Sequence, residues 1–147
     1  MWLPGNQSIN TFTGFLKPDP EITLTIPSAT DKAISVGAYD TSTDKVASFS
    51  GRGFTRENNQ IKPDIVAPGV NIRSAATGGG TTVLSGTSMA TPIVSGVICM
   101  ILGINKEMSN IQCKKLIRNT AIDLKMEGNR QGWGKINPEK MVNFCKK

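Results

Sequence analysis

The 147-residue sequence contains no histidine. Histidine is the commonest general base in hydrolytic enzymes and the commonest metal ligand, because its pKa lies near neutrality. The chain by itself therefore cannot hold a Ser-His-Asp triad, a Cys-His dyad or a histidine-based zinc site. An activity that depends on one of these must take its histidine from another segment or another chain.

Cysteines and aromatic residues are also scarce. The three cysteines, Cys99, Cys113 and Cys145, form no Cys-x-x-Cys pair and are odd in number, which argues against a disulfide framework or a zinc site. Aromatic residues make up 5% of the chain and are not interleaved with basic ones. The net charge of +6, spread over scattered lysines and arginines, therefore indicates a solvated basic surface and no nucleic-acid partner.

Long apolar runs are missing as well. A membrane-spanning helix needs about 20 apolar residues, and the longest candidate, at 93–104, is interrupted by Ser95, Gly96 and Gly103. The first four residues lack the basic and apolar regions of a signal peptide. The length and the 38% of hydrophobic residues fit one domain with a buried core, without a membrane segment.

The arrangement of apolar runs and breakers predicts alternating short strands and helices. Residues 1–21 are rich in proline and glycine and are interpreted as a linker or the tail of a preceding segment, with 22–147 as the domain portion. Short strands are expected at 22–26, 33–39, 46–49, 64–67, 70–75 and 81–84. Helices are expected at 87–102, 109–119 and 138–144, with a glycine-rich loop at 128–134. The first helix is apolar on almost all sides and is expected to be buried.

One segment, residues 85–92, has a pattern suited to chemistry. A strand leads through Gly86 into a helix that begins near Ser88. A helix N-terminus presents unpaired N–H groups and a partial positive charge, which stabilise an oxyanion that forms beside a serine hydroxyl. Taken as Gly-Thr-Ser alone, the pattern favours a serine that merely caps the helix.

The full string resembles a known family. Residues 86–92 read Gly-Thr-Ser-Met-Ala-Thr-Pro, which matches the nucleophile motif of the subtilisin-like serine proteases (subtilases, peptidase family S8) at every position. Residues 62–70, 33–38 with 47–50, and 132–137 resemble other core motifs of that family, in the same order. Parts of residues 1–20 resemble clostridial subtilases, including spore-germination proteases, that carry an inserted domain upstream.

The resemblance implies roles for individual residues. Ser88 would be the nucleophile, and its own N–H would donate to the oxyanion, with Gly86 and Thr87 supporting the oxyanion hole. The family's second oxyanion donor is an asparagine upstream of the 33–39 strand, and Asn6 is interpreted as a turn residue rather than this donor. The segment that matches the S1 specificity pocket comprises Thr25, Ile26, Pro27 and Ser28. No metal ion or other cofactor is expected, and calcium dependence of the parent is left open.

The family's triad order is Asp, His, Ser, so a chain without histidine resembles the C-terminal part of a catalytic domain. The implied fold is an α/β three-layer sandwich with a mainly parallel sheet, of which this chain is the C-terminal portion. The implied partners are a peptide or protein substrate and the N-terminal half of the domain, and an exposed sheet edge would favour self-association. The isolated chain is expected to be inactive.

Two alternatives to the peptidase remain at this point. The first is a pseudoprotease or interaction module that keeps the subtilase scaffold for binding. Intact aspartate and histidine motifs in the parent would favour the peptidase, and a replaced motif would favour the pseudoprotease. The second is an unrelated serine hydrolase, whose nucleophile turn would read Gly-x-Ser-x-Gly. The sequence has alanine at the last position of that pattern, Ala90. Bacterial secretion or spore association fits the resemblance, but the sequence does not determine the compartment.

Overall fold

The structure is a computed structural model that describes residues 14, 16, 17 and 19–146. Interpretations that concern Asn6, and most of the 1–21 tail, lie outside the described residues. The strands are β1 (Val36–Asp40), β2 (Lys45–Val46), β3 (Gly53–Phe54), β4 (Ile61–Lys62), β5 (Ile65–Pro68), β6 (Ile72–Ala75) and β7 (Thr81–Leu84). The helices are α1 (Thr87–Ile104), α2 (Asn110–Thr120), α3 (Gly128–Gln131) and α4 (Pro138–Cys145).

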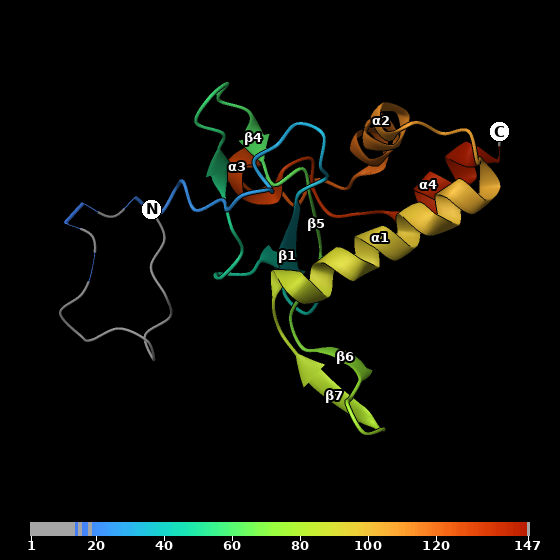
Figure 1. Cartoon of the computed structure of the whole chain (residues 1–147), viewed down its shortest axis with the longest axis horizontal. Helices are drawn as coiled ribbons and strands as arrows, with labels where there is room; N and C mark the ends of the chain where they lie inside the picture. Colours follow the sequence, from blue (N-terminus) through green and yellow to red (C-terminus); the bar gives the residue numbers. More distant parts are fainter. Residues whose placement is uncertain (1–13, 15, 18, 147) are drawn as a thin grey trace.

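A parallel pair of strands forms the centre of the fold. β1 lies between β5, which is parallel to it, and β2, which is antiparallel. Both central strands are short apolar runs without alternation, as expected for strands buried on both faces; Ala38, Ile65, Val66 and Ala67 are fully buried. Figure 1 shows α1 running past the sheet, with α2 and α4 at its far end.

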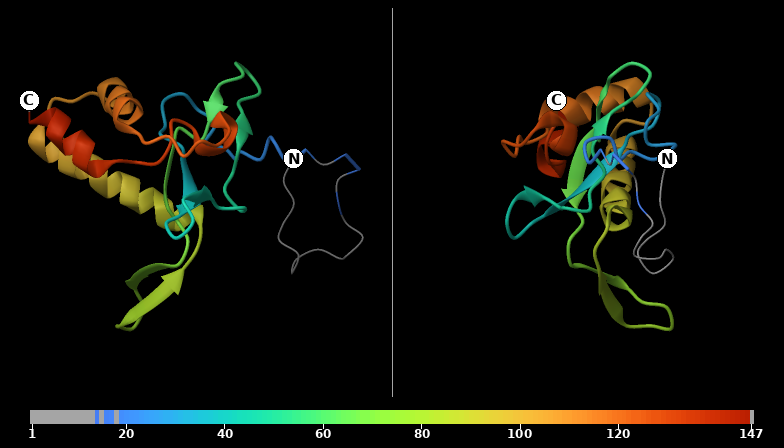
Figure 2. Two further views of the ribbon diagram at one scale, coloured as in Figure 1. Left: turned by 180° about the vertical axis from the view of Figure 1, so that it is seen from behind. Right: turned by 90° about the vertical axis from the view of Figure 1, so that its left-hand side faces the viewer.

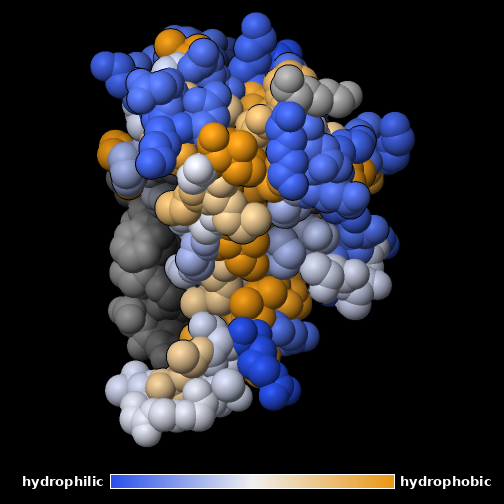
Figure 3. Space-filling view, turned by 90° about the vertical axis from the view of Figure 1, so that its right-hand side faces the viewer, coloured by the Kyte–Doolittle hydropathy of each residue, from blue (hydrophilic) through white to orange (hydrophobic). Residues whose placement is uncertain are grey.

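α1 contributes one side to the core and leaves the other open. Its buried residues, Ala90, Val94, Val97 and Ile101, recur every three or four positions and pack with β1 and β5. The expectation that this helix is buried all round is therefore wrong. Met100 and Ile104 are 56% and 44% exposed, and apolar surface extends over this end of the molecule toward β7 (Figure 3). An apolar surface of this kind normally marks a contact with another element.

By length and composition, α1 is also the one described helix that could cross a membrane, with a mean hydropathy of 1.8. The same helix forms the core with Ala90, Val94, Val97 and Ile101, and fully burying each of the larger of these side chains contributes about 1.5–3 kcal/mol. Only 22% of this helix is buried in the described structure, so much of its apolar surface is uncovered.

The β6–β7 hairpin stands apart from this core. Residues 72–75 pair with 81–84 in antiparallel register, and Figure 2 shows the hairpin projecting from the body in both views. Its tip is the run Gly78–Gly79–Gly80, where all three residues have positive φ. The hairpin leads directly into α1, so its end determines where that helix begins.

Several expected elements differ from the structure. The expected strand at 22–26 is wrong: residues 22–25 have no regular structure and a turn follows, because Thr23 pairs with Arg52 through isolated hydrogen bonds and not through a ladder. The β3–β4 hairpin and α3 were not expected, because two-residue strands and a single helical turn leave no periodicity. The strand at 46–49 ends after Val46, and the strand at 70–75 begins at Ile72.

The sheet edges are more covered than expected. Beside β1, beyond its two-residue ladder with β2, the Ala38 N–H donates to the Ser50 hydroxyl at 3.1 Å and the Ala38 carbonyl accepts from the Ala47 N–H at 2.9 Å. On the β5 side, Val66 exchanges hydrogen bonds with Gly134 and Ile136. These contacts occupy the backbone groups through which we expected copies of the chain to associate. Self-association stays a prediction.

The pattern Ser-x-x-Gln at residues 109–112 predicts a capping box at the start of α2, and the structure confirms it. The Gln112 N–H donates to the Ser109 hydroxyl at 3.3 Å, and the Ser109 N–H donates to the Gln112 side chain at 2.8 Å. We expect Ser109→Ala to lower the free energy of unfolding by about 1 kcal/mol, because the Gln112 N–H at the start of the helix loses its acceptor. Urea unfolding of the chain measures this effect. Ser95→Ala, on the exposed side of α1, is the control and should have almost none; equal losses would contradict the assignment.

Candidate active site

The backbone after β5 and the backbone before α1 meet at the carboxyl end of the parallel pair. The Gly69 N–H donates to the Tyr39 carbonyl at 3.0 Å, and the Gly69 carbonyl accepts from the Gly86 N–H at 2.8 Å. The Asn71 N–H donates to the Ser85 hydroxyl at 2.9 Å. Loops beyond the carboxyl ends of parallel strands are the usual place for sites in open α/β sheets. The turn before Ser88 is therefore fixed to the sheet by three hydrogen bonds.

Ser88 is the second residue of α1 and is exposed. The Met89 and Ala90 N–H groups both approach the Gly86 carbonyl, at 3.1 and 3.4 Å. Among the described residues, the N–H groups of Thr87 and Ser88 and the Ser88 hydroxyl make no hydrogen bond. Two free N–H groups thus lie at the positive end of an 18-residue helix that has no acidic residue in its first turn.

The interpretation of Ser88 as a helix cap is wrong. The N-cap is Gly86, and no side chain caps this helix. A serine that neither caps the helix nor bonds to a described neighbour keeps its hydroxyl available for chemistry. Within the described part of the chain, no base contacts this hydroxyl, in line with the absence of histidine.

Pro92 removes one helical hydrogen bond next to this serine. Proline is tolerated in the first turn of a helix, but Pro92 is the sixth residue of α1. Its nitrogen would otherwise donate to the carbonyl four residues earlier, which is that of Ser88. One turn away, the Thr91 hydroxyl donates to the Thr87 carbonyl at 2.9 Å. The carbonyl of Ser88 is therefore left without the usual helical partner.

The tightest backbone packing around this turn occurs at Gly69 and not at Gly86. A Cβ atom at Gly86 would make ordinary contacts, the nearest 3.6 Å away. A Cβ atom at Gly69 would lie 2.5 Å from the Ala38 Cβ and 3.0 Å from the Gly86 carbonyl oxygen. Sequence reasoning did not single out Gly69 as a site residue, although a Pro-Gly pair that closes an apolar strand is a signal for it.

We expect Gly69→Ala to destabilise the chain by about 1–3 kcal/mol, because the added methyl group overlaps β1 and pushes the Gly86 turn away. Chemical denaturation measures the loss. Gly96→Ala is the matched control, since a Cβ there meets no atom within 4 Å and alanine favours the helix. A Gly69→Ala variant as stable as the Gly96→Ala variant would show that the turn is not packed this tightly.

The predicted S1 segment forms a separate local turn. Ser28 N–H donates to the Thr25 carbonyl at 2.9 Å, and Thr30 N–H donates to the Pro27 carbonyl at 3.1 Å. The Ile26–Pro27 peptide bond is cis, and Ile26 is 92% exposed. No hydrogen bond among the described residues joins this turn to residues 85–92. Its role in a specificity pocket stays a prediction.

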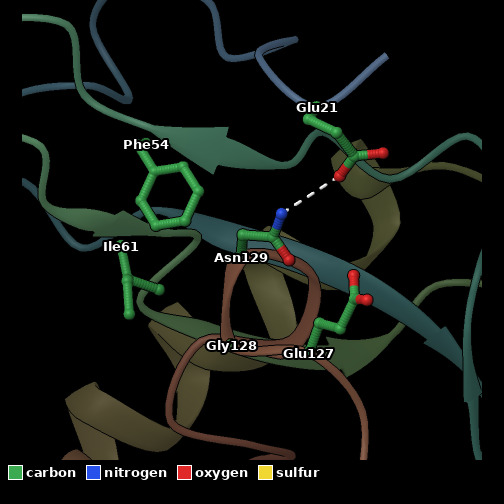
Figure 4. A pocket seen from close by; sticks show the side chains of 6 residues that line it. All are labelled: Glu21, Phe54, Ile61, Glu127, Gly128 and Asn129. Carbon is green, nitrogen blue, oxygen red and sulfur yellow. Dashed lines mark hydrogen bonds between the residues drawn. The ribbon is translucent and has the colours of Figure 1, made fainter.

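Two surface depressions lie away from Ser88. The larger, of about 550 Å³, is lined by Phe54 and Ile61 of the β3–β4 hairpin and by residues 127–129 and Glu21. Figure 4 shows the Asn129 amide pointing to Glu21, a hydrogen bond of 3.0 Å. The second, of about 290 Å³, lies between α1, α2 and residues 32–34. Neither includes residues 85–92, and no group of three metal-ligating side chains occurs in the described part of the chain.

Comparison with known proteins shows which family this chain resembles. Residues 4–134 match the Peptidase_S8 model, described as the subtilase family. The chain is 38% identical over 146 aligned residues to the serine protease AprX of Bacillus subtilis, covering 85% of this chain and 33% of AprX. It is 38% identical over 116 residues to subtilisin Savinase of Lederbergia lenta, covering 79% of this chain and 40% of the relative.

Solved structures agree with the family match. The Clostridium perfringens CspB protease superposes with a TM-score of 0.80 at 33% identity, over 91% of this chain and 31% of CspB. The self-cleaved protease domain of PatA gives a TM-score of 0.66 at 33% identity, over 82% of this chain and 44% of that domain. These matches confirm the expected subtilisin-like α/β fold and the likeness to a clostridial protease. The chain spans about a third of AprX and of CspB, and it belongs to the subtilase family.

Proposed function

We propose that this chain supplies the nucleophile, Ser88, of a serine endopeptidase site. The proposal rests on the surroundings of Ser88. Among the described residues, its hydroxyl is exposed and makes no hydrogen bond, and it lies beside two free N–H groups at the start of α1. In this role the Ser88 oxygen attacks the scissile carbonyl of a peptide or protein substrate and forms an acyl-enzyme. The free N–H groups stabilise the oxyanion that develops during the attack.

The general base has to come from outside these 147 residues, because they contain no histidine. The proposed partner is a subtilase segment that carries the aspartate and histidine. The open side of α1, with Met100 and Ile104 exposed, is available to pack against such a segment. A serine without its base retains little reactivity, since removal of any triad member leaves only the contribution of the oxyanion hole and binding. The isolated chain is therefore inactive in this proposal.

The test compares the isolated chain with a chimera. In the chimera, the part of AprX that matches this chain is replaced by residues 19–147 of this chain. We expect no hydrolysis of a fluorogenic peptide by the isolated chain and clear turnover by the chimera. A chimera that melts cooperatively but never hydrolyses peptide would favour the alternative, a subtilase scaffold kept for binding. Turnover by the isolated chain would contradict the need for an external base.

A further inference from the structure

Two of the three cysteines lie in one part of the core. Cys113 of α2 is 4% exposed and belongs to the main core cluster, and Cys145, the last residue of α4, is partly buried and packs against the same cluster. Both thiols are free. Cys99, by contrast, lies on the exposed side of α1. The proposed peptidase role uses none of the three.

The contact between α2 and α4 brings these cysteines into one region of the core. Figure 1 shows α2 and α4 near the end of the molecule where α1 ends. The two helices are in contact. Cys113 is the fourth residue of α2, with buried Ile117 one turn on. Cys145 ends α4, with buried Met141 one turn back. Cys113 belongs to the main core cluster and Cys145 packs against that cluster, and the charge of Cys145 acts on the Cys113 thiol, so the two thiols lie near each other.

We propose that Cys113 and Cys145 form a reversible disulfide that links α2 to α4 when the chain meets a low-molecular-weight disulfide such as oxidised glutathione. Cys145 is the more accessible thiol, and its thiolate attacks one sulfur of the oxidant, which releases one thiol and leaves a mixed disulfide. The Cys113 thiolate then attacks the Cys145 sulfur and releases the second thiol. Two protein thiols are oxidised by two electrons, and the oxidant's disulfide is reduced to two thiols.

The surroundings of Cys113 determine how fast the link closes. Burial raises the pKa of the Cys113 thiol, and the neighbouring Cys145 raises it further. Since the thiolate is the attacking species, closure speeds up as the pH rises toward that pKa. In the reduced state, both side chains pack as small apolar groups.

The link would fasten the C-terminal helix to the rest of the fold. It closes a loop of about 30 residues, for which the loss of chain entropy in the unfolded state predicts a rise in Tm of roughly 10 °C. The cysteines are on α2 and α4, away from the turn at Ser88. The inference is therefore independent of the proposed peptidase activity.

The test treats the full, folded chain with oxidised glutathione at pH 8, blocks remaining thiols with iodoacetamide and digests it with trypsin without reduction. We expect one disulfide-linked pair of peptides, residues 107–114 joined to 141–146. We also expect a Tm about 10 °C higher, reversed by dithiothreitol. Cys113→Ser and Cys145→Ser should each abolish the linked pair and the shift, whereas Cys99→Ser, the matched control, should keep both.

Three outcomes would overturn the proposal. The first is stable glutathione adducts without the linked peptides. The second is a link that forms only in denaturant, which would mean that the folded chain keeps the thiols apart. The third is a bridge that involves Cys99, within one chain or between two copies, in place of the link between α2 and α4.

Discussion

Replacing Ser88 by alanine is expected to lower the kcat of the AprX chimera by at least about 10⁴-fold, because no acyl-enzyme can form without the hydroxyl. The KM of the peptide should change little, since alanine removes only the reacting atom. Ser88 is exposed and caps nothing in α1, so the variant should fold like the parent. Steady-state kinetics and a thermal melt of the same preparation measure both points.

Ser95→Ala is the matched control for this experiment. Ser95 is exposed on the same helix, about two turns after Ser88, and its replacement should leave kcat unchanged. An active Ser88→Ala chimera would assign the hydrolysis to another residue. Equal losses in the two variants would point to an effect on the helix and not on the chemistry.

The second large effect is expected from Asp64→Ala. The Asp64 carboxylate is 6% exposed and accepts from the Lys62 ammonium at 2.7 Å, from the Ser35 N–H at 2.7 Å and from the Ser35 hydroxyl at 3.0 Å. The Lys62 side chain is 1% exposed and also donates to the Thr30 carbonyl. Without Asp64, the Lys62 charge is buried and unpaired. Breaking such a pair costs about 3–5 kcal/mol, a large share of the stability of a typical domain.

Lys114 adds to the same cluster. Its ammonium lies 3.8 Å from the Asp64 carboxylate. Burial lowers the pKa of Lys114, and Asp64 counteracts this effect. Removing the carboxylate therefore leaves the ammonium groups of Lys62 and Lys114 close together without a neutralising charge. This repulsion adds to the expected loss in the free energy of unfolding.

The measurement is the free energy of unfolding in urea, with Asp123→Ala as the matched control. Asp123 also pairs with a lysine two positions away, at 3.0 Å from Lys125, but the two side chains are 53% and 86% exposed. An exposed pair contributes about 0–1 kcal/mol, so this control should lose much less stability than Asp64→Ala, although Asp123 also accepts from the Lys125 N–H and the Gln131 amide at 2.8 Å each. Similar losses for both variants would mean that the Lys62–Asp64 pair is not buried in solution.

The parts of the fold that the sequence predicted are those with a strong local pattern. The serine motif, the capping box at Ser109 and the central apolar strands depend on neighbouring residues, so they could be recognised. The position of Ser88 at the start of a helix followed in the same way. The structure added that Gly86, and not Ser88, is the cap.

The parts that were missed depend on residues far apart in the chain. α1 looks apolar on all sides, but which side is buried is decided by β1 and β5, about 20 to 50 residues earlier. The role of Gly69 depends on its contacts with Ala38 and Gly86. The 22–26 segment has strand-forming residues, yet tertiary contacts to Arg52 keep it irregular. Local propensity contains none of this information.

The most direct test of the account is to find which serine reacts. The AprX chimera, treated with a fluorophosphonate probe that phosphonylates activated serines, is digested, and the labelled peptide is sequenced by mass spectrometry. The account predicts one label, on Ser88, and no label on the isolated chain, which has no histidine to activate the hydroxyl. A label on another serine of the active chimera would contradict the assignment of Ser88 as the nucleophile.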